Sequence, residues 1–416
     1  MESFYHLNNI LYVESVAIDK IVQNLETPFY CYSYNNIVDN YLLLEKSFVR
    51  IKPLICFAVK ANSNLAVLSI IASLGGGVDA VSKGEIIRAF KSGIASNKIS
   101  FSGVGKTYEE LKFALENDIL QFNIESESEL LLLNQVALEL DKQAYIALRV
   151  NPDIDGMTHH KISTGKKDNK FGIYWTEIEN IARQSKDLKY INLVGISTHI
   201  GSQIVEIEPF ARTFQLITQL VNDLNNQGHN IKRLDLGGGI GISYLENDKL
   251  FALQEYASLA EKCALDTGCD LILEPGRLIV GNSGILVTKI TYIKETKWRN
   301  FLIVDAGMND LMRPSLYDAV HQIVPVHIKE TKSYHNKFDI VGPVCETSDV
   351  FLEDSTFNQK MDVGDLLAIK TTGAYGAVMA STYNSRLLIP EVMVRNNKWR
   401  IIRRRPTYDD MLGLEL

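Results

Sequence analysis

Short apolar runs alternate with helical patterns from residue 54 onward. Eight of these runs are rich in β-branched and aromatic residues and have the length of buried strands. They cover residues 54–59, 77–81, 98–102, 120–124, 144–150, 193–199, 231–236 and 271–274. Strands that alternate with helices are typical of a parallel sheet with crossover helices. Eight such units predict an α/β fold, a (β/α)8 TIM-type barrel.

Helix start signals stand between the proposed strands. Ser82, Thr107 and Ser126 are each followed three residues later by a glutamate, the pattern of a capping box at a helix N-terminus. A longer helix is predicted from near Pro209 to Gly228. Its apolar face has helical spacing and consists of Phe210, Phe214, Ile217, Val221 and Leu224.

The alternation of strand and helix patterns stops after about residue 281. The later β-prone runs follow one another with no comparable helical pattern between them, which predicts a second, all-β C-terminal domain. Residues 1–33 also contain β-prone pieces, so we expect N-terminal strand segments to join the C-terminal sheet. The predicted domains are a barrel over 34–280 and a Greek-key-like β-sandwich made of 1–33 together with 281–416.

The composition is that of a folded globular protein. Hydrophobic residues make up 46% and charged residues 22% of the 416 positions, which argues against a disordered, collagen-like or coiled-coil chain. The formal net charge of −7 gives no global reason to expect nucleic acid or a membrane surface as a partner. Five scattered cysteines without CxxC spacing fit a reduced compartment. With neither a membrane-length apolar run nor a standard secretion signal, we expect a cytoplasmic protein.

Chemically distinctive residues stand at the predicted carboxyl ends of four strands, where barrels of this type place their chemistry. They are Lys60, His199, the run Gly237–Gly239, and Glu274 with Arg277. Each has an ordinary explanation when taken alone: a surface lysine, a structural histidine, a tight turn and a loop ion pair. Their joint placement at one mouth of the barrel favours a functional site.

The glycine run indicates the kind of ligand. Three consecutive glycines let the backbone approach an anion closely, and barrels often bind phosphate after strands seven and eight. A lysine facing such a site can form a Schiff base with an aldehyde. An aldehyde combined with a phosphate indicates pyridoxal 5′-phosphate. Glu274 would then keep the pyridine nitrogen protonated, and His199 could stack on the ring.

Seven motifs together resemble the barrel-type, fold type III pyridoxal-phosphate decarboxylases. They are FAVKAN, VDAVSKGE, HIGSQ, LDLGGGIGISY, EPGR, GPVCET and GAYG, in the order of that family and over nearly the whole chain. The set is most similar to the diaminopimelate decarboxylases. This resemblance implies pyridoxal phosphate as cofactor and the decarboxylation of meso-2,6-diaminopimelate to L-lysine and carbon dioxide, the last step of lysine biosynthesis.

The resemblance also implies roles for single residues. Lys60 would bind the cofactor aldehyde, and Lys60, His199 and Cys345 would be the catalytic residues. The implied cofactor contacts are Lys60, Asp79, His199, Gly237, Gly238, Gly239, Glu274, Gly276, Arg277 and Tyr375. The implied substrate contacts are Arg277, Arg313, Tyr317, Glu346 and Tyr375. Two arginines suit a dicarboxylic substrate, because each can hold one carboxylate through paired hydrogen bonds.

Cys345 is, in the family pattern, the proton donor to the carbanion, and Glu346 could take the distal ammonium group. The ordinary alternative for Cys345 is a buried small apolar residue. The family further implies a homodimer in which the Cys345–Glu346 loop of one subunit completes the site of its partner.

Other interpretations stay open at this point. One is an ornithine, arginine or carboxynorspermidine decarboxylase of the same fold, although those relatives usually lack a second arginine resembling Arg313. Another is a non-catalytic homologue that binds a cofactor or a partner, although Lys60, Cys345 and Glu274 are all present. A barrel racemase is a third, but that relative places an arginine near the ring nitrogen.

Three local features lie outside this scheme. His159 and His160 are adjacent rather than one helical turn apart, so we interpret them as loop residues and predict no metal site. The basic run between Arg395 and Arg405 is interpreted as a solvated edge strand. Lys83, where relatives commonly have a small residue, could change local anion contacts.

Overall fold

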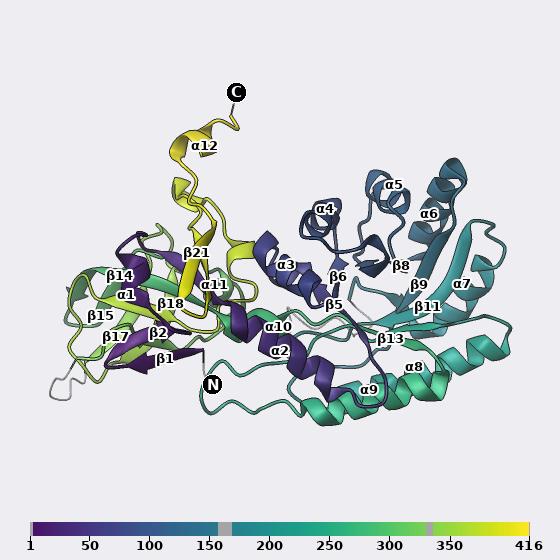
Figure 1. Ribbon diagram of the computed structural model, residues 1–416, viewed down its shortest axis with the longest axis horizontal. Helices are drawn as coiled ribbons and strands as arrows, with labels where there is room; N and C mark the ends of the chain where they lie inside the picture. Colours follow the sequence, from purple (N-terminus) through teal and green to yellow (C-terminus); the bar gives the residue numbers. More distant parts are fainter. Residues whose placement is uncertain (1–2, 157–168, 330–335, 416) are drawn as a thin grey trace. The chain divides into compact units, whose positions relative to one another are not determined.

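A computed structural model describes residues 3–156, 169–329 and 336–415 of the chain (Figure 1). It divides into two compact units. The sheet unit comprises Met1–Asp39, Ser243–Asp248 and Ile279–Leu416, and the barrel unit comprises Asn40–Ile242 and Lys249–Leu278. His159 and His160 lie outside the described residues. None of the described helices combines the length and the apolarity that crossing a membrane requires.

The barrel unit is built on eight parallel strands that close on themselves in the order β5-β6-β7-β8-β9-β11-β12-β13. The strands are β5 (Leu54–Ala58), β6 (Gly77–Ala80), β7 (Ile99–Phe101), β8 (Gln121–Ile124), β9 (Ala144–Asn151), β11 (Ile191–Thr198), β12 (Arg233–Asp235) and β13 (Asp270–Leu273), with the short β10 (Ile173–Tyr174) beside β9. All eight predicted strand ranges overlap these strands. The predicted (β/α)8 barrel is therefore confirmed.

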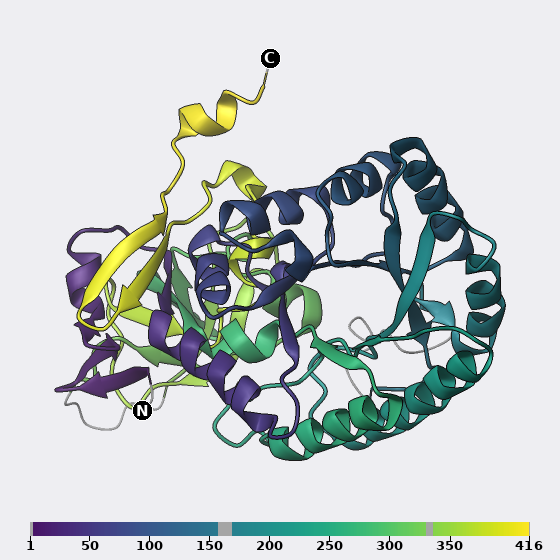
Figure 2. The same cartoon turned by 45° about the vertical axis from the view of Figure 1, so that its right-hand side comes forward.

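Helices surround the strands of this unit (Figure 2). The helices between residues 34 and 267 are α2 (Tyr34–Ser47), α3 (Leu65–Ser73), α4 (Lys83–Lys91), α5 (Tyr108–Glu116), α6 (Glu127–Leu140), α7 (Ile178–Ser185), α8 (Glu208–Asn226) and α9 (Leu253–Thr267). The predicted apolar face of α8 is buried along its whole length. Burial of such a face contributes about 1.5–3 kcal/mol for each large apolar side chain, which fixes the helix against the strands.

The predicted helix caps are present, with one difference in detail. Thr107 and Glu110 form a full capping box at the start of α5. Ser82 and Ser126 also accept the N–H group three residues ahead at the starts of α4 and α6. At these two helices the glutamate, Glu85 or Glu129, accepts the N–H of the residue before the cap. The distances are 2.8 Å from Val81 N to Glu85 and 2.9 Å from Glu125 N to Glu129. Each helix start therefore still satisfies backbone donors that would otherwise lack a partner.

The sheet unit contains a nine-stranded sheet with β18-β17-β15-β14-β4-β20-β21 as its main path, and a three-stranded sheet β1-β2-β3. Its strands are β1 (Phe4–Leu7), β2 (Ile10–Val13), β3 (Val16–Ala17), β4 (Phe29–Ser33), β14 (Gly284–Glu295), β15 (Asn300–Val304), β16 (Ile323–Pro325), β17 (Lys337–Val341), β18 (Val350–Thr356), β19 (Leu366–Ile369), β20 (Glu391–Arg395) and β21 (Lys398–Arg403). Strand β4 pairs with both β14 and β20, so the N-terminal segment joins the C-terminal sheet as predicted.

Short helices interrupt this mainly β unit. They are α1 (Ile18–Val22), α11 (Arg313–Tyr317) and α12 (Tyr408–Leu412), and the four-residue α10 (Arg277–Val280) lies at its boundary. The core between the sheets contains Phe29, Ile285 and Val392, each at most 1% exposed. The β-prone runs predicted the strands, whereas helices of about one turn leave too little periodicity to be recognised in the sequence.

The basic run between Arg395 and Arg405 contains the edge strand β21, as predicted. Several of its side chains are paired rather than simply solvated. Arg403 forms an ion pair with Glu391 at 2.9 Å, and Arg404 forms one with Asp410 at 2.6 Å. These contacts connect the basic run to β20, which contains Glu391, and to the C-terminal α12, which contains Asp410.

Candidate active site

Lys60 and Asp79 face each other at the carboxyl ends of two adjacent barrel strands. Lys60 lies in a short 3₁₀ helix directly after β5, and its Nζ is 3.8 Å from Oδ2 of Asp79, which lies in β6. The Asp79 side chain is 1% exposed, and neither of its oxygens has a hydrogen-bond partner among the described residues. A buried carboxylate without a donor is unfavourable, so this position suits a ligand that supplies a cation or a hydrogen bond.

His199 directly follows β11 and has a defined protonation pattern. Its Nδ1 accepts the N–H of Gly238 at 3.2 Å, so the proton of the neutral ring is on Nε2. Burial, followed by the positive charges of Lys60 and Arg149, lowers the pKa of His199 well below its usual value. A neutral imidazole at this position suits packing against the face of a flat ring.

Neighbouring backbone comes so close to the three positions after β12 that only glycine fits there. A Cβ at Gly237, Gly238 or Gly239 would meet a carbonyl oxygen at 2.3, 2.1 or 2.3 Å. These oxygens belong to the ends of the neighbouring strands or to the loops that follow them. Gly237 and Gly239 also have φ values of 66° and 91°, in the left-handed region that favours glycine. Any side chain here would force the strand ends apart.

The N–H groups of the predicted phosphate cradle are not equivalent. Gly237 donates to Oδ1 of Asp235 at 3.1 Å, and Gly238 donates to His199. The N–H groups of Gly239 and Gly276 have no acceptor among the residues that the structure describes. Unsatisfied N–H groups beside a glycine run fit a phosphate, so these two donors are the best candidates.

Glu274 belongs to a buried acidic cluster inside the barrel. Asn123 on β8 donates to Oδ2 of Asp235 at 3.0 Å and to Oε1 of Glu274 at 3.3 Å. Burial, with the charges of Asp235 and Asp79, raises the pKa of Glu274 well above its usual value. Burial also raises the pKa of Asp235 to about 6. The cluster therefore binds a proton more readily than exposed carboxyl groups do and suits a basic ring nitrogen.

Three polar residues of this mouth were missed by the sequence analysis. Asp235 lies within the glycine motif, and Arg149 is a charged residue near the end of an apolar strand, so both carried a usable signal. Arg149 is 9% exposed and forms an ion pair of 2.6 Å with Glu125. Asn123 carried no signal, because the sequence does not show whether a polar residue in a short strand points into the barrel or away from it.

A second set of predicted residues lies in the sheet unit. Arg313 and Tyr317 are the first and last residues of α11, and Tyr375 has a left-handed φ of 56° in the loop after β19. Cys345 and Glu346 lie in the loop between β17 and β18, and both are exposed. The structure therefore does not support the alternative of a buried Cys345.

The loop that carries Cys345 is held by hydrogen bonds from within the same unit. Asn384 accepts the Cys345 N–H at 2.8 Å, and the Tyr383 hydroxyl donates to Oε2 of Glu346 at 3.3 Å. The buried Asp349 carboxylate accepts the N–H of Val344 at 2.7 Å. These contacts order an exposed loop that has no regular secondary structure.

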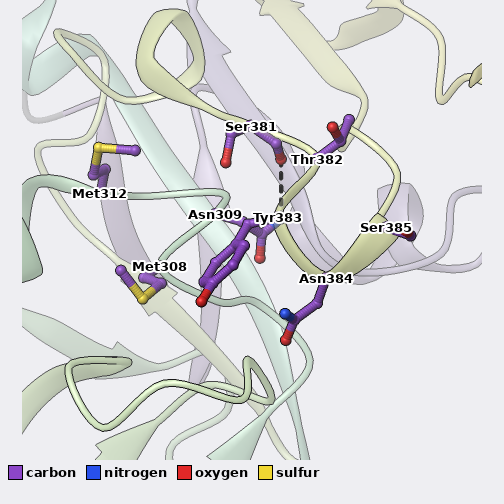
Figure 3. Close-up of a pocket in the computed structure, with 8 residues that line it drawn as sticks. All are labelled: Met308, Asn309, Met312, Ser381, Thr382, Tyr383, Asn384 and Ser385. Atoms are coloured by element: carbon purple, nitrogen blue, oxygen red, sulfur yellow. Dashed lines mark hydrogen bonds between the residues drawn. The ribbon is translucent and has the colours of Figure 1, made fainter.

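The residues that hold this loop also line a pocket (Figure 3). The pocket has a volume of about 600 Å³ and is lined by Met308, Asn309, Met312 and the segment from Ser381 to Ser385, which contains Tyr383 and Asn384. Ser381 donates its N–H to the Asn309 carbonyl at 2.8 Å across the pocket wall. The loop that carries Cys345 is thus attached to the wall of this pocket through Asn384.

The chain resembles known proteins of a single family over nearly its full length. Residues 34–281 match the family model described as the pyridoxal-binding domain of pyridoxal-dependent decarboxylases. The diaminopimelate decarboxylase of Aquifex aeolicus is 43% identical over 96% of this chain and 94% of its own. That of Zymomonas mobilis is 43% identical over 97% and 96% of the two chains.

Solved structures give the same result. Diaminopimelate decarboxylase from Helicobacter pylori, in complex with L-lysine, has a TM-score of 0.91 at 42% identity and covers 96% of this chain and 99% of its own. The M. jannaschii enzyme, also with L-lysine, has a TM-score of 0.94 at 35% identity and covers 100% and 98%. The chain therefore belongs to the diaminopimelate decarboxylase family of pyridoxal-dependent decarboxylases.

Proposed function

We propose that this protein decarboxylates meso-2,6-diaminopimelate to L-lysine and carbon dioxide with pyridoxal phosphate as cofactor. The observation that carries the proposal is 43% identity over 96% of the chain to a diaminopimelate decarboxylase, combined with a barrel mouth whose residues fit the cofactor. The relatives solved in complex with L-lysine support lysine as the product.

The cofactor, when bound, supplies an electron-withdrawing ring that stabilises the charge left by the departing carboxylate. Lys60 would hold its aldehyde, and the backbone N–H groups of Gly239, Gly276 and Arg277 would hold its phosphate. Glu274 would hold a proton at the ring nitrogen, where the raised pKa of the acidic cluster keeps that proton available. The neutral His199 would pack against the ring.

Substrate recognition is proposed to rest on charge pairing. Arg277 and Arg313 would each bind one carboxylate of the substrate, because a guanidinium offers two parallel N–H donors to a carboxylate. Glu346 would bind the distal ammonium group. Tyr317 and Tyr375 would complete the substrate contacts. A substrate with a single carboxylate would leave one arginine without its anionic partner.

Cys345 is proposed to donate the proton that replaces the departing carboxylate. Its thiol is exposed and its backbone N–H is fixed by Asn384, so the side chain can reach a bound substrate. We propose further that the protein is a cytoplasmic homodimer in which the Cys345–Glu346 loop of one subunit completes the site of the other. Mixing inactive Lys60→Ala and Cys345→Ala proteins tests this arrangement, since only shared sites regain activity in a mixed dimer.

The direct test of the function is product identification. Purified protein with pyridoxal phosphate is incubated with meso-diaminopimelate, and in parallel with L-ornithine and L-arginine. Release of L-lysine and carbon dioxide from meso-diaminopimelate alone supports the proposal. Consumption of ornithine or arginine without lysine formation overturns the substrate assignment in favour of a relative of different specificity.

The assignment of Lys60 has its own test. Reduction of the loaded enzyme with borohydride should fix the cofactor to the peptide that contains Lys60, and Lys60→Ala should abolish that label. A label on another peptide would overturn the cofactor site, even if the enzyme released lysine.

A further inference from the structure

The side chain of Arg313 is held from two directions by residues that the proposed function does not use. Its Nη1 lies 2.8 Å from Nε2 of His321, and its guanidinium carbon lies 4.7 Å from the centre of the Tyr244 ring. Arg313 is 7% exposed and His321 is 1% exposed. Tyr244 comes from a segment about seventy residues earlier in the chain that belongs to the same sheet unit.

The partners of His321 define its protonation state. Its Nδ1 lies 2.9 Å from the carbonyl oxygen of Lys370, which can only accept, so Nδ1 carries a proton. Its Nε2 faces Arg313, which can only donate, so Nε2 offers a lone pair. A single neutral tautomer satisfies both contacts. The ring therefore connects the guanidinium to backbone directly after β19 (Leu366–Ile369).

Tyr244 completes the arrangement. Its ring lies against the Arg313 guanidinium, an attractive contact between a cation and an aromatic face. The same ring meets His321 at right angles, with 5.2 Å between the ring centres. The Tyr244 N–H donates to the Asp248 carboxylate at 2.7 Å, which fixes the segment that carries the ring. The contacts of Arg313 thus include one at Nη1 and one on the face of its guanidinium.

A free arginine side chain populates many rotamers, and ordering it on ligand binding opposes affinity. Contacts made before the substrate arrives remove that penalty. We propose that His321 and Tyr244 are positioning residues that fix the Arg313 guanidinium, and thereby set the preference for a substrate that carries a second carboxylate. This rests on the proposed function, in which Arg313 binds one carboxylate of the substrate, and it assigns to Arg313 the carboxylate that remains in the product.

Two pairs of variants separate positioning from general support of the fold. His321→Asn can keep the hydrogen bond to the Lys370 carbonyl but cannot reach Arg313, whereas His321→Gln places an acceptor near the position of Nε2. Tyr244→Leu removes the aromatic face, whereas Tyr244→Phe keeps it. Each holoenzyme is first checked for thermal stability and for the absorption of bound cofactor.

We expect His321→Asn and Tyr244→Leu to raise KM for meso-diaminopimelate about tenfold, since a hydrogen bond to a charged group is lost or misplaced. The value of kcat should change less than about twofold, because this carboxylate is held equally in the ground and transition states. His321→Gln and Tyr244→Phe should stay close to the parent protein. Inhibition by L-lysine should weaken in parallel with KM, while inhibition by 1,5-diaminopentane, which lacks the carboxylate, should not change.

Arg313→Ala distinguishes a failure of this inference from a failure of the proposed function. If Arg313→Ala leaves both KM and inhibition by L-lysine unchanged, the substrate role of Arg313 in the proposed function is wrong. If Arg313→Ala weakens both but folded, cofactor-loaded His321→Asn and Tyr244→Leu do not, the positioning inference is overturned. A fall in kcat alone, equal in the conservative and disruptive variants, also overturns it.

Discussion

The side-chain oxygen of Asn384 accepts a hydrogen bond of 2.8 Å from the backbone N–H of Cys345. Asn384 has a φ of 56°, in the left-handed region that asparagine and glycine tolerate better than other residues. One of the contacts that hold the exposed Cys345 loop therefore comes from a side chain that itself requires an unusual backbone. Under the proposed function, the same contact sets where the Cys345 thiol is presented.

This relationship predicts a kinetic effect that separates orientation from binding. Asn384→Gly keeps the left-handed backbone and removes the acceptor, so we expect kcat to fall about tenfold or more with little change in KM, because a misplaced reacting group loses rate. Asn384→Asp keeps the acceptor and should retain most of the activity. Steady-state kinetics on cofactor-loaded protein, with alkylation of Cys345 as a second measurement, check this. Equal kcat values for Asn384→Gly and the parent would show that the contact has no role in presenting the thiol.

The acidic cluster predicts a pH dependence of apoprotein stability. Burial raises the folded-state pKa of Asp235 to about 6 and that of Glu274 well above its usual value, so the folded barrel binds these protons more tightly than the unfolded chain. Their contribution to stability is therefore greatest at low pH and falls as pH rises from about 4 through the folded-state values. We expect the Glu274→Gln apoprotein to lose less stability than the parent as the pH rises.

The measurement is the thermal unfolding midpoint of the apoprotein between pH 5 and pH 8. The midpoint of Glu274→Gln should rise relative to the parent as pH increases, while its affinity for pyridoxal phosphate falls. Glu116→Gln, at an exposed position on α5, is the matched control and should follow the parent at every pH. A constant difference between Glu274→Gln and the parent would contradict the inferred proton retention by the buried pair.

Local signals predicted much of the barrel and part of its mouth. The strands were recognisable because each is a short apolar run and helix start signals follow several of them, and Lys60, His199 and Glu274 stand where such runs end. The contact of Asn123 with Asp235 joins residues 112 positions apart, and each looks ordinary in its own strand. No local pattern encodes such a pair, because only closure of the barrel brings the two strands together.

The sheet unit was less predictable for a related reason. Arg313 and Cys345 were identified only through the family resemblance, and their partners His321 and Asn384 were not identified at all. Each partner makes its contact from a loop or a single turn, through a hydrogen bond that exists only when the sheet is assembled. Hydrophobic periodicity carries no information about contacts of this kind.

The glycine run predicts a steric effect that is independent of any ligand. A Cβ at Gly238 would lie 2.1 Å from the carbonyl oxygen of Glu274, which is backbone and cannot move without shifting the end of β13. We expect Gly238→Ala to destabilise the apoprotein by about 1–3 kcal/mol or more through overpacking. Gly105→Ala is the control, since its Cβ would meet no atom within 4 Å. Urea unfolding of both apoproteins checks the difference, and equal midpoints would exclude the steric explanation.

Two ion pairs of equal length differ in burial, and this difference predicts how much each contributes to the free energy of unfolding. The Nζ atoms of Lys106 and Lys249 each lie 2.6 Å from a glutamate oxygen, of Glu129 and Glu206 respectively. The first pair is nearly inaccessible, at 1% and 7% exposed, while the second is 61% and 44% exposed. Burial outweighs the attraction of Lys106 and raises the pKa of Glu129, which shows how unfavourable this carboxylate is even with its partner present.

Lys106→Met would leave Glu129 without its cation inside the barrel unit, and Lys106 also donates to the carbonyl oxygens of Gly103 and Asn123. We therefore expect Lys106→Met to lower the unfolding free energy by about 3–5 kcal/mol, as breaking a buried ion pair does. Lys249→Met should lower it by less than about 1 kcal/mol, because water screens an exposed pair. Urea unfolding at pH 7 measures both. The double variant Lys106→Met/Glu129→Leu should recover part of the loss, since it removes the stranded charge, and a double variant no more stable than Lys106→Met would instead assign the loss to the backbone contacts of Lys106.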